Sequence, residues 1–196
     1  MPLGANKAAI MGVSGVSTAD VVLIQSQTAT SDASLSFTSG IDSTYGEYIF
    51  KFYNCNPETD NAVWTFNVSV DGGSNYDAVL KTTTYFRTYH DEANSGAVLQ
   101  YVNTQDLAQS ANYQHIGQDV GNGSDESCAG VLHLFNPSST TYIKHFYNVS
   151  EVYAGYDYTY NSFSAGYCNT TSAINAVAFK MSAGDFDGTI KLWGVK

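Results

Sequence analysis

Residues 63–70, VWTFNVSV, decide the fold class of this chain. Large apolar residues occupy every second position, namely Trp64, Phe66, Val68 and Val70, and smaller or polar residues lie between them. Because successive side chains of a β-strand point to opposite faces, this pattern predicts a strand with one buried face. The next residues, Asp-Gly-Gly-Ser-Asn at 71–75, supply the glycines that a tight turn requires.

The same alternation recurs along the chain, whereas the helical period of about 3.6 is nearly absent. Further candidate strands cover residues 21–27, 34–39, 47–54, 76–86, 97–102, 130–135, 141–149, 174–181 and 188–193. Only residues 104–112 have the composition of a short helix. About ten strands without intervening helices predict an all-β fold, an antiparallel, jelly-roll-like β-sandwich with little or no helix.

Composition supports a single β-domain and excludes several function classes. The chain has 196 residues, of which 13 % are charged, and its net charge is −10. This acidity argues against a nucleic-acid partner, because the phosphate backbone would repel the protein. No apolar run is long enough for a membrane-spanning helix, so no membrane is expected either. The cysteines Cys55, Cys128 and Cys168 lack the spacing of a zinc site and predict buried free thiols in a protein made in a reducing cytoplasm.

A tyrosine-rich segment, VYAGYDYTYNSF at residues 152–163, is a candidate binding surface. Its tyrosines are Tyr153, Tyr156, Tyr158 and Tyr160. In an extended strand, Tyr156, Tyr158 and Tyr160 share one face and Asp157 lies on the other. Since an unpaired carboxylate is costly to bury, the tyrosines are expected to face the core or a second subunit. A platform for a ligand such as a sugar remains the third alternative.

Recognisable catalytic or cofactor-binding motifs are missing. There is no nucleophile elbow, P-loop or dinucleotide fingerprint. The histidines, His90, His115, His133 and His145, fall on separate segments and are expected to be structural. Two acidic turns offer oxygen ligands for calcium, Asp119, Asp125, Asp185 and Asp187, but neither matches the twelve-residue calcium loop. The sequence therefore predicts no catalytic residue, no cofactor and no metal, and an enzyme such as a polysaccharide depolymerase is the least favoured class.

Two predicted strands are apolar on both faces. Residues 47–54 carry Tyr48, Phe50 and Phe52 on one face and Ile49 and Tyr53 on the other, and residues 131–135 follow the same pattern. A strand that is apolar on both sides is normally covered on both sides. A two-layer sandwich covers only one face, so neighbouring chains are expected to cover the other.

Four segments together resemble small virion structural proteins of tailed bacteriophages. They are ASLSFTSGIDSTYGEYIFKFYN (33–54), NVSVDGGSNYD (67–77), LHLFNPSSTTYIKHF (132–146) and the closing INAVAFKMSAGDFDGTIKLWGVK (174–196). The resemblance covers most of residues 20–196 and implies a β-sandwich that assembles as a symmetric oligomer on the capsid or the tail. It supplies no catalytic residues.

This resemblance suggests a role for the N-terminal segment. Residues 1–19 are small and apolar, with Lys7 as their single charge, and are predicted to be an arm outside the sandwich domain of residues 20–196. A decoration protein acts by burying surface against the capsid, so the arm is expected to anchor it. The predicted anchoring residues are Pro2, Leu3, Lys7, Ile10, Met11, Val13 and Val16.

The leading hypothesis is a non-enzymatic capsid decoration (cement) protein, a homotrimer that binds the major capsid protein on the virion surface. The alternative is a carbohydrate- or receptor-binding module of a phage tail fibre, with a glycan as its ligand. The sequence alone does not decide between head and tail.

Overall fold

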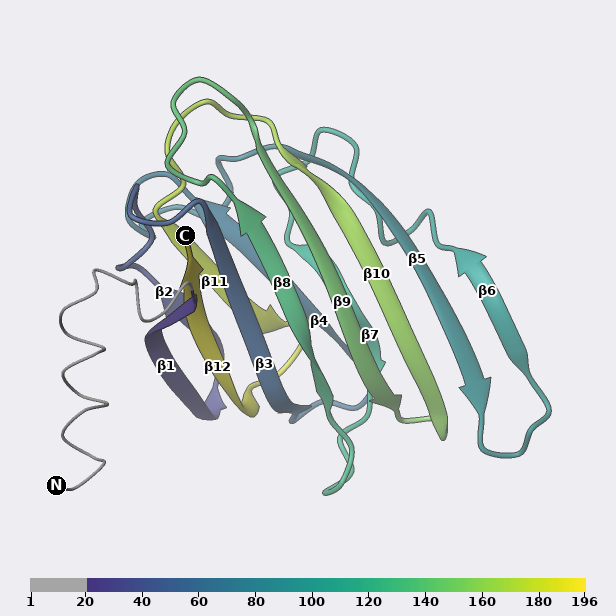
Figure 1. Ribbon diagram of the computed structural model, residues 1–196. Coiled ribbons are helices and arrows are strands. Elements are labelled where there is room, and N and C mark those ends of the chain that lie inside the picture. Colours follow the sequence, from purple (N-terminus) through teal and green to yellow (C-terminus); the bar gives the residue numbers. More distant parts are fainter. Residues whose placement is uncertain (1–20) are drawn as a thin grey trace, which may run out of the picture.

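The computed structural model describes residues 21–196, which form twelve β-strands and no helix (Figure 1). The strands are β1 (Val21–Asp32), β2 (Leu35–Phe37), β3 (Glu47–Pro57), β4 (Ala62–Ser69), β5 (Lys81–Asp91), β6 (Ala97–Tyr101), β7 (Gln114–Val120), β8 (Cys128–Phe135), β9 (Lys144–Ala154), β10 (Tyr158–Cys168), β11 (Ala176–Met181) and β12 (Phe186–Val195). All strand pairs are antiparallel. The predicted all-β antiparallel sandwich is confirmed.

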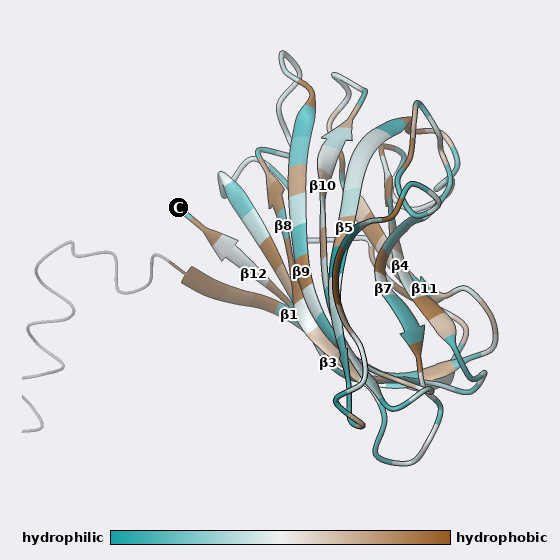
Figure 2. Cartoon of the chain, turned by 90° about the vertical axis from the view of Figure 1, so that its right-hand side faces the viewer, coloured by the Kyte–Doolittle hydropathy of each residue, from teal (hydrophilic) through white to brown (hydrophobic). Residues whose placement is uncertain are grey.

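The strands form two layers. The large sheet has the order β1-β12-β3-β8-β9-β10-β5-β6, and the small sheet has the order β7-β4-β11-β2. Figure 2 shows the small sheet packed along one side of the large one. We call the side of the large sheet that points away from the small sheet its outer face.

A short seam joins the two layers. Strand β9 bonds to β8 and β10 along its length, but its ladder with β7 is confined to the pair Val120 and Ala154. Farther along, Asn148 Nδ2 donates to the Ile116 carbonyl oxygen across 3.0 Å, and the Ser150 hydroxyl donates to the same oxygen. All twelve strands thus belong to one hydrogen-bonded sheet that folds over itself.

Aromatic side chains fill the space between the layers. The buried members include Phe37, Phe50, Phe52, Trp64, Phe66, Phe146, Phe179 and Phe186. Trp64 of β4 stacks on Phe179 of β11 at 5.8 Å, and Phe66 meets Phe146 of the large sheet edge-on at 4.9 Å. Edge-to-face and offset stacked pairs stabilise a core beyond the area that they bury. The alternation in residues 63–70 therefore places Trp64 and Phe66 where it predicted them. The prediction of a single buried face is wrong, because Thr65, Asn67 and Ser69 on the opposite face are buried as well.

Two local predictions were wrong. Residues 104–112 contain turns and bends instead of a short helix. The run predicted for residues 76–86 becomes a strand only at Lys81, because residues 71–80 form a loop over the small sheet. Within residues 21–196, no helix is long and apolar enough to cross a membrane.

Candidate functional site

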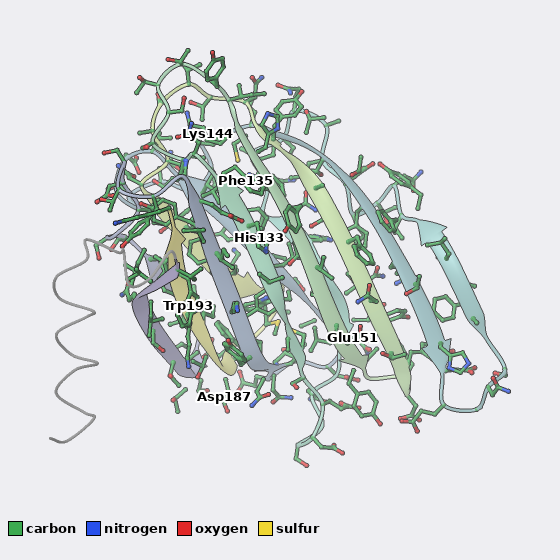
Figure 3. The ribbon with its side chains drawn as sticks, viewed as in Figure 1. His133, Phe135, Lys144, Glu151, Asp187 and Trp193 are labelled. Carbon is green, nitrogen blue, oxygen red and sulfur yellow. The ribbon has the colours of Figure 1, made fainter. Side chains whose placement is uncertain are left out.

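The outer face of the large sheet carries two straight rows of mostly apolar side chains. The strand registers align Tyr101, Phe86, Phe163, Val149 and Val131 in the first row and Ala165, Tyr147, His133, Ile49, Trp193 and Leu23 in the second. Figure 3, which looks toward this face, labels His133 and Phe135 on β8 and Trp193 on β12. We call these rows the outer-face band. They cross every strand of the large sheet.

Several side chains of the outer-face band are open to solvent. Tyr101 is 53 % exposed, Leu23 is 45 % exposed, and Phe86 and Tyr147 are each close to 40 %. In one chain the outer faces of β3 and β8, which the sequence predicts to be apolar, are partly exposed. A contiguous apolar surface of this kind typically marks an interaction site.

Aromatic rings in the band stand on edge. Phe86 and Phe163 are 4.9 Å apart with their planes 9° from parallel, and His133 and Tyr147 are 4.4 Å apart at 12°. These separations match the roughly 4.8 Å spacing of neighbouring strands, so each ring covers the face of the next one. The ring edges point outward, whereas a sugar platform needs a ring face open to solvent.

A hollow of about 550 Å³ lies at the Ala165 end of the second row. The small side chain of Ala165 leaves space between Tyr147, Tyr167 and Thr84. Pockets lined by aromatic residues near the middle of an apolar patch commonly receive an anchor side chain from a partner. The hollow therefore provides a place for one protruding side chain.

The outer face carries few charged residues. Its acidic residues have hydrogen-bond partners, whereas its lysines lack a nearby carboxylate. His133 Nδ1 lies 2.5 Å from Glu47 Oε1, and Glu151 accepts hydrogen bonds from Thr159 and Asn161. Lys51 and Lys191 lie directly opposite each other on β3 and β12. In residues 21–196 neither lysine has a carboxylate within 4.0 Å. Their amines lie instead over Trp193 and Tyr53, at 5.8 and 5.5 Å from the ring centroids. Opposed like charges destabilise a sheet, so this arrangement favours an acidic partner surface.

The predicted tyrosine group divides between three locations. Tyr158 and Tyr160 lie on the inner face of β10, beside Tyr89 of β5. Tyr153 lies on the outer face of β9, and its hydroxyl donates to Glu92 Oε1 at 3.2 Å. The prediction that Tyr156 shares a strand face with Tyr158 is wrong. The chain turns between Ala154 and Tyr158, with φ of 58° at Asp157, and leaves Tyr156 exposed.

The inner tyrosines surround a cation. The Arg87 guanidinium lies 4.6 Å from the ring centroid of Tyr160 and 3.7 Å from Asp119 Oδ2. Burial raises the pKa of the Tyr160 hydroxyl, although the neighbouring Arg87 partly opposes that shift. Burial also raises the pKa of Asp119, although Arg87 opposes that shift. This cluster lies on the inner side of the large sheet.

The other predicted residues do not assemble into a site. Asp119 pairs with Arg87, and Asp187 accepts the backbone N–H of Ser31 at 2.7 Å. Residues 21–196 contain no cluster of three or more potential metal ligands. His90 contacts Asn94 within its own turn. The predicted anchoring residues, Pro2, Leu3, Lys7, Ile10, Met11, Val13 and Val16, lie outside the described residues.

Comparisons with known proteins give no independent assignment. No protein-family model, no curated protein and no solved structure matches this chain. The outer-face band is therefore interpreted from its own geometry and chemistry.

Proposed function

We propose that this protein is a non-enzymatic structural component of a virion, most simply a capsid decoration protein, that docks through the outer face of its large sheet. The main observation behind this proposal is the outer-face band. Its two rows of mostly apolar side chains are partly exposed to solvent in a single chain. The resemblance of the sequence to phage virion proteins supports the same role. In this proposal the major capsid protein or a neighbouring copy covers the band.

The chemistry of the band favours a protein partner over a sugar. The stacked pairs Phe86–Phe163 and His133–Tyr147 present ring edges, which suit packing against side chains. The hollow at Ala165 accepts an anchor residue, and the opposed Lys51 and Lys191 suit carboxylates. Aromatic residues and a few charges around a desolvated centre are typical of protein interfaces.

The test measures co-sedimentation of the full chain with virion heads that lack it. Tyr147→Asp places a charge in the centre of the band, and we expect at least a hundredfold weaker binding. The matched control is Tyr142→Asp, because Tyr142 is also an exposed tyrosine but lies in the loop before β9. Equal binding of both variants, with unchanged thermal unfolding, contradicts docking through the outer face.

Two further measurements separate this proposal from its alternatives. Antibody labelling of intact particles places the protein on the head or on the tail. Deletion of residues 2–16 tests the N-terminal arm, and we expect loss of capsid association from a chain that still folds. Label confined to the tail would favour the tail-fibre module instead.

A further inference from the structure

A polar hollow of about 630 Å³ lies on the opposite side of the molecule, over the small sheet. Its floor is one row across three strands: His115 of β7, Thr65 of β4 and Lys180 of β11 are direct cross-strand neighbours. They point away from the core because the adjacent Trp64 and Phe66 point into it. The walls come from two loops that contribute Tyr76, Asp77 and Tyr113.

The buried side chain of Asn67 holds both wall loops in place. Asn67 is fully buried, and its side-chain amide donates to the carbonyl oxygens of Tyr76 and Ala111, at 2.6 and 2.9 Å. Its Oδ1 accepts a hydrogen bond from the buried Lys81 amine. One side chain thus ties both loops to β4, so the hollow is preformed.

Several polar groups in the hollow have no partner. The Lys180 amine lies 4.2 Å from the ring centroid of Tyr113, and in the described chain no carboxylate lies within 4.0 Å of it. Two more polar atoms, the Tyr76 hydroxyl and His115 Nδ1, have no hydrogen-bond partner among the described residues, but they are closed off from solvent and lie behind the surface of the hollow. Burial lowers the pKa of His115. The groups that the hollow offers to a ligand are therefore the Lys180 amine and the polar side chains of the two loops.

We propose that this polar hollow binds a carbohydrate. A sugar ring presents neighbouring hydroxyls that both donate and accept, and the hollow offers both kinds of partner. Lys180 and the amides of Asn75 and Asn112 donate, and Asp77 accepts. The tyrosines add an apolar wall, and the volume lies in the range of small-ligand sites. A phosphate or another simple anion fits less well, because the Asp77 carboxylate lines the same space.

The carbohydrate site goes beyond the proposed docking function and does not depend on it. The outer-face band belongs to the large sheet and the hollow to the other side of the small sheet. A chain docked through the large sheet would therefore hold the hollow away from the particle, open to a surface glycan. The two inferences use different residues and can fail separately.

The test uses the full chain on an array of neutral and uronic-acid-containing oligosaccharides, followed by calorimetric titration of the strongest hit. Lys180→Ala removes the unpaired donor, and we expect at least a tenfold loss of affinity. Asn112→Ala, in an exposed loop, probes the same hollow without changing a strand and is expected to weaken binding severalfold. The matched control is Lys51→Ala on the outer face, which should bind the sugar as the wild type does.

Three results would overturn the inference. They are the absence of any reproducible array signal, undiminished affinity in both hollow variants, and loss of affinity in the Lys51→Ala control. Inorganic phosphate is titrated in parallel. Competition by phosphate at the sugar's own affinity would show an anion site instead of a carbohydrate site.

Discussion

Replacing the buried Lys81 by methionine tests the electrostatics of the polar interior. Lys81 is fully buried, and its amine donates to Asn67 Oδ1 at 2.5 Å and to the Val79 carbonyl oxygen at 3.3 Å. No carboxylate of the described residues pairs with it. Burial lowers the pKa of the amine from 10.5 to about 8, although Cys168 and Asp77 partly oppose that shift.

The pKa shift sets the sign and the size of a pH effect on stability. Below pH 8 the amine is charged in the folded and the unfolded chain, and the cost of burying it is present in full. Between pH 8 and 10.5 the unfolded chain binds more protons, so the free energy of unfolding rises with pH. At about 1.4 kcal/mol for each pKa unit, the whole effect is about 3 kcal/mol.

The measurement is urea unfolding of the wild type and Lys81→Met, followed by tryptophan fluorescence. We expect the wild type to gain about 2 kcal/mol relative to the variant between pH 8 and pH 10. Tyrosines and cysteines titrate in both proteins, so their contributions largely cancel in the difference. The exposed Lys51→Met gives the control for the loss of one lysine charge from the surface. A pH-independent difference for Lys81→Met would refute the assignment of a depressed pKa.

Three other predictions concern packing, thiols and assembly. Gly130→Ala should lower the free energy of unfolding by about 1–3 kcal/mol, because an added Cβ would meet the carbonyl oxygen of Val149 and the ring of Phe52. An unchanged free energy of unfolding in chemical denaturation would contradict this clash. A thiol reagent should label none of the buried cysteines in the native protein and all three after unfolding, since buried thiols are inert; rapid native labelling would show that the core opens. The proposed homotrimer should sediment with three times the 21.1 kDa mass of one chain, and a monomer at every concentration argues against it.

The strand pattern could be predicted from the sequence because alternation is a local signal. The alternation in residues 63–70 and 47–54 predicted which side chains of each strand face the core. The burial of Trp64 and Phe50 agrees with these predictions. Strand β7 was not predicted, because glutamine, histidine, glycine and aspartate interrupt its apolar alternation. The turn at Tyr156 was also missed, since Asp157 adopts a positive φ that a strand pattern does not reveal.

Strand neighbours, in contrast, could not be predicted from the sequence. The outer-face band exists because the registers place Tyr147 beside His133 and Ile49 beside Trp193, across segments far apart in the chain. The apolar second faces of β3 and β8 were the only local sign of it. The polar hollow left no local sign, because Thr65, His115 and Lys180 meet only through strand pairing.

The short seam between β7 and β9 has a mechanical consequence. Sliding one layer past the other would strain the Val120–Ala154 ladder pair and the side-chain bonds from Asn148 and Ser150 to β7. It would also strain the polar contacts of β5 with the small sheet, Lys81–Asn67 and Arg87–Asp119. Packed rings such as Phe66 and Phe146 add to this resistance, because they must separate before the layers can move. A chain held by its large sheet would therefore pass a sideways pull to the small sheet through its aromatic core and a few side-chain contacts, with only one ladder pair of backbone.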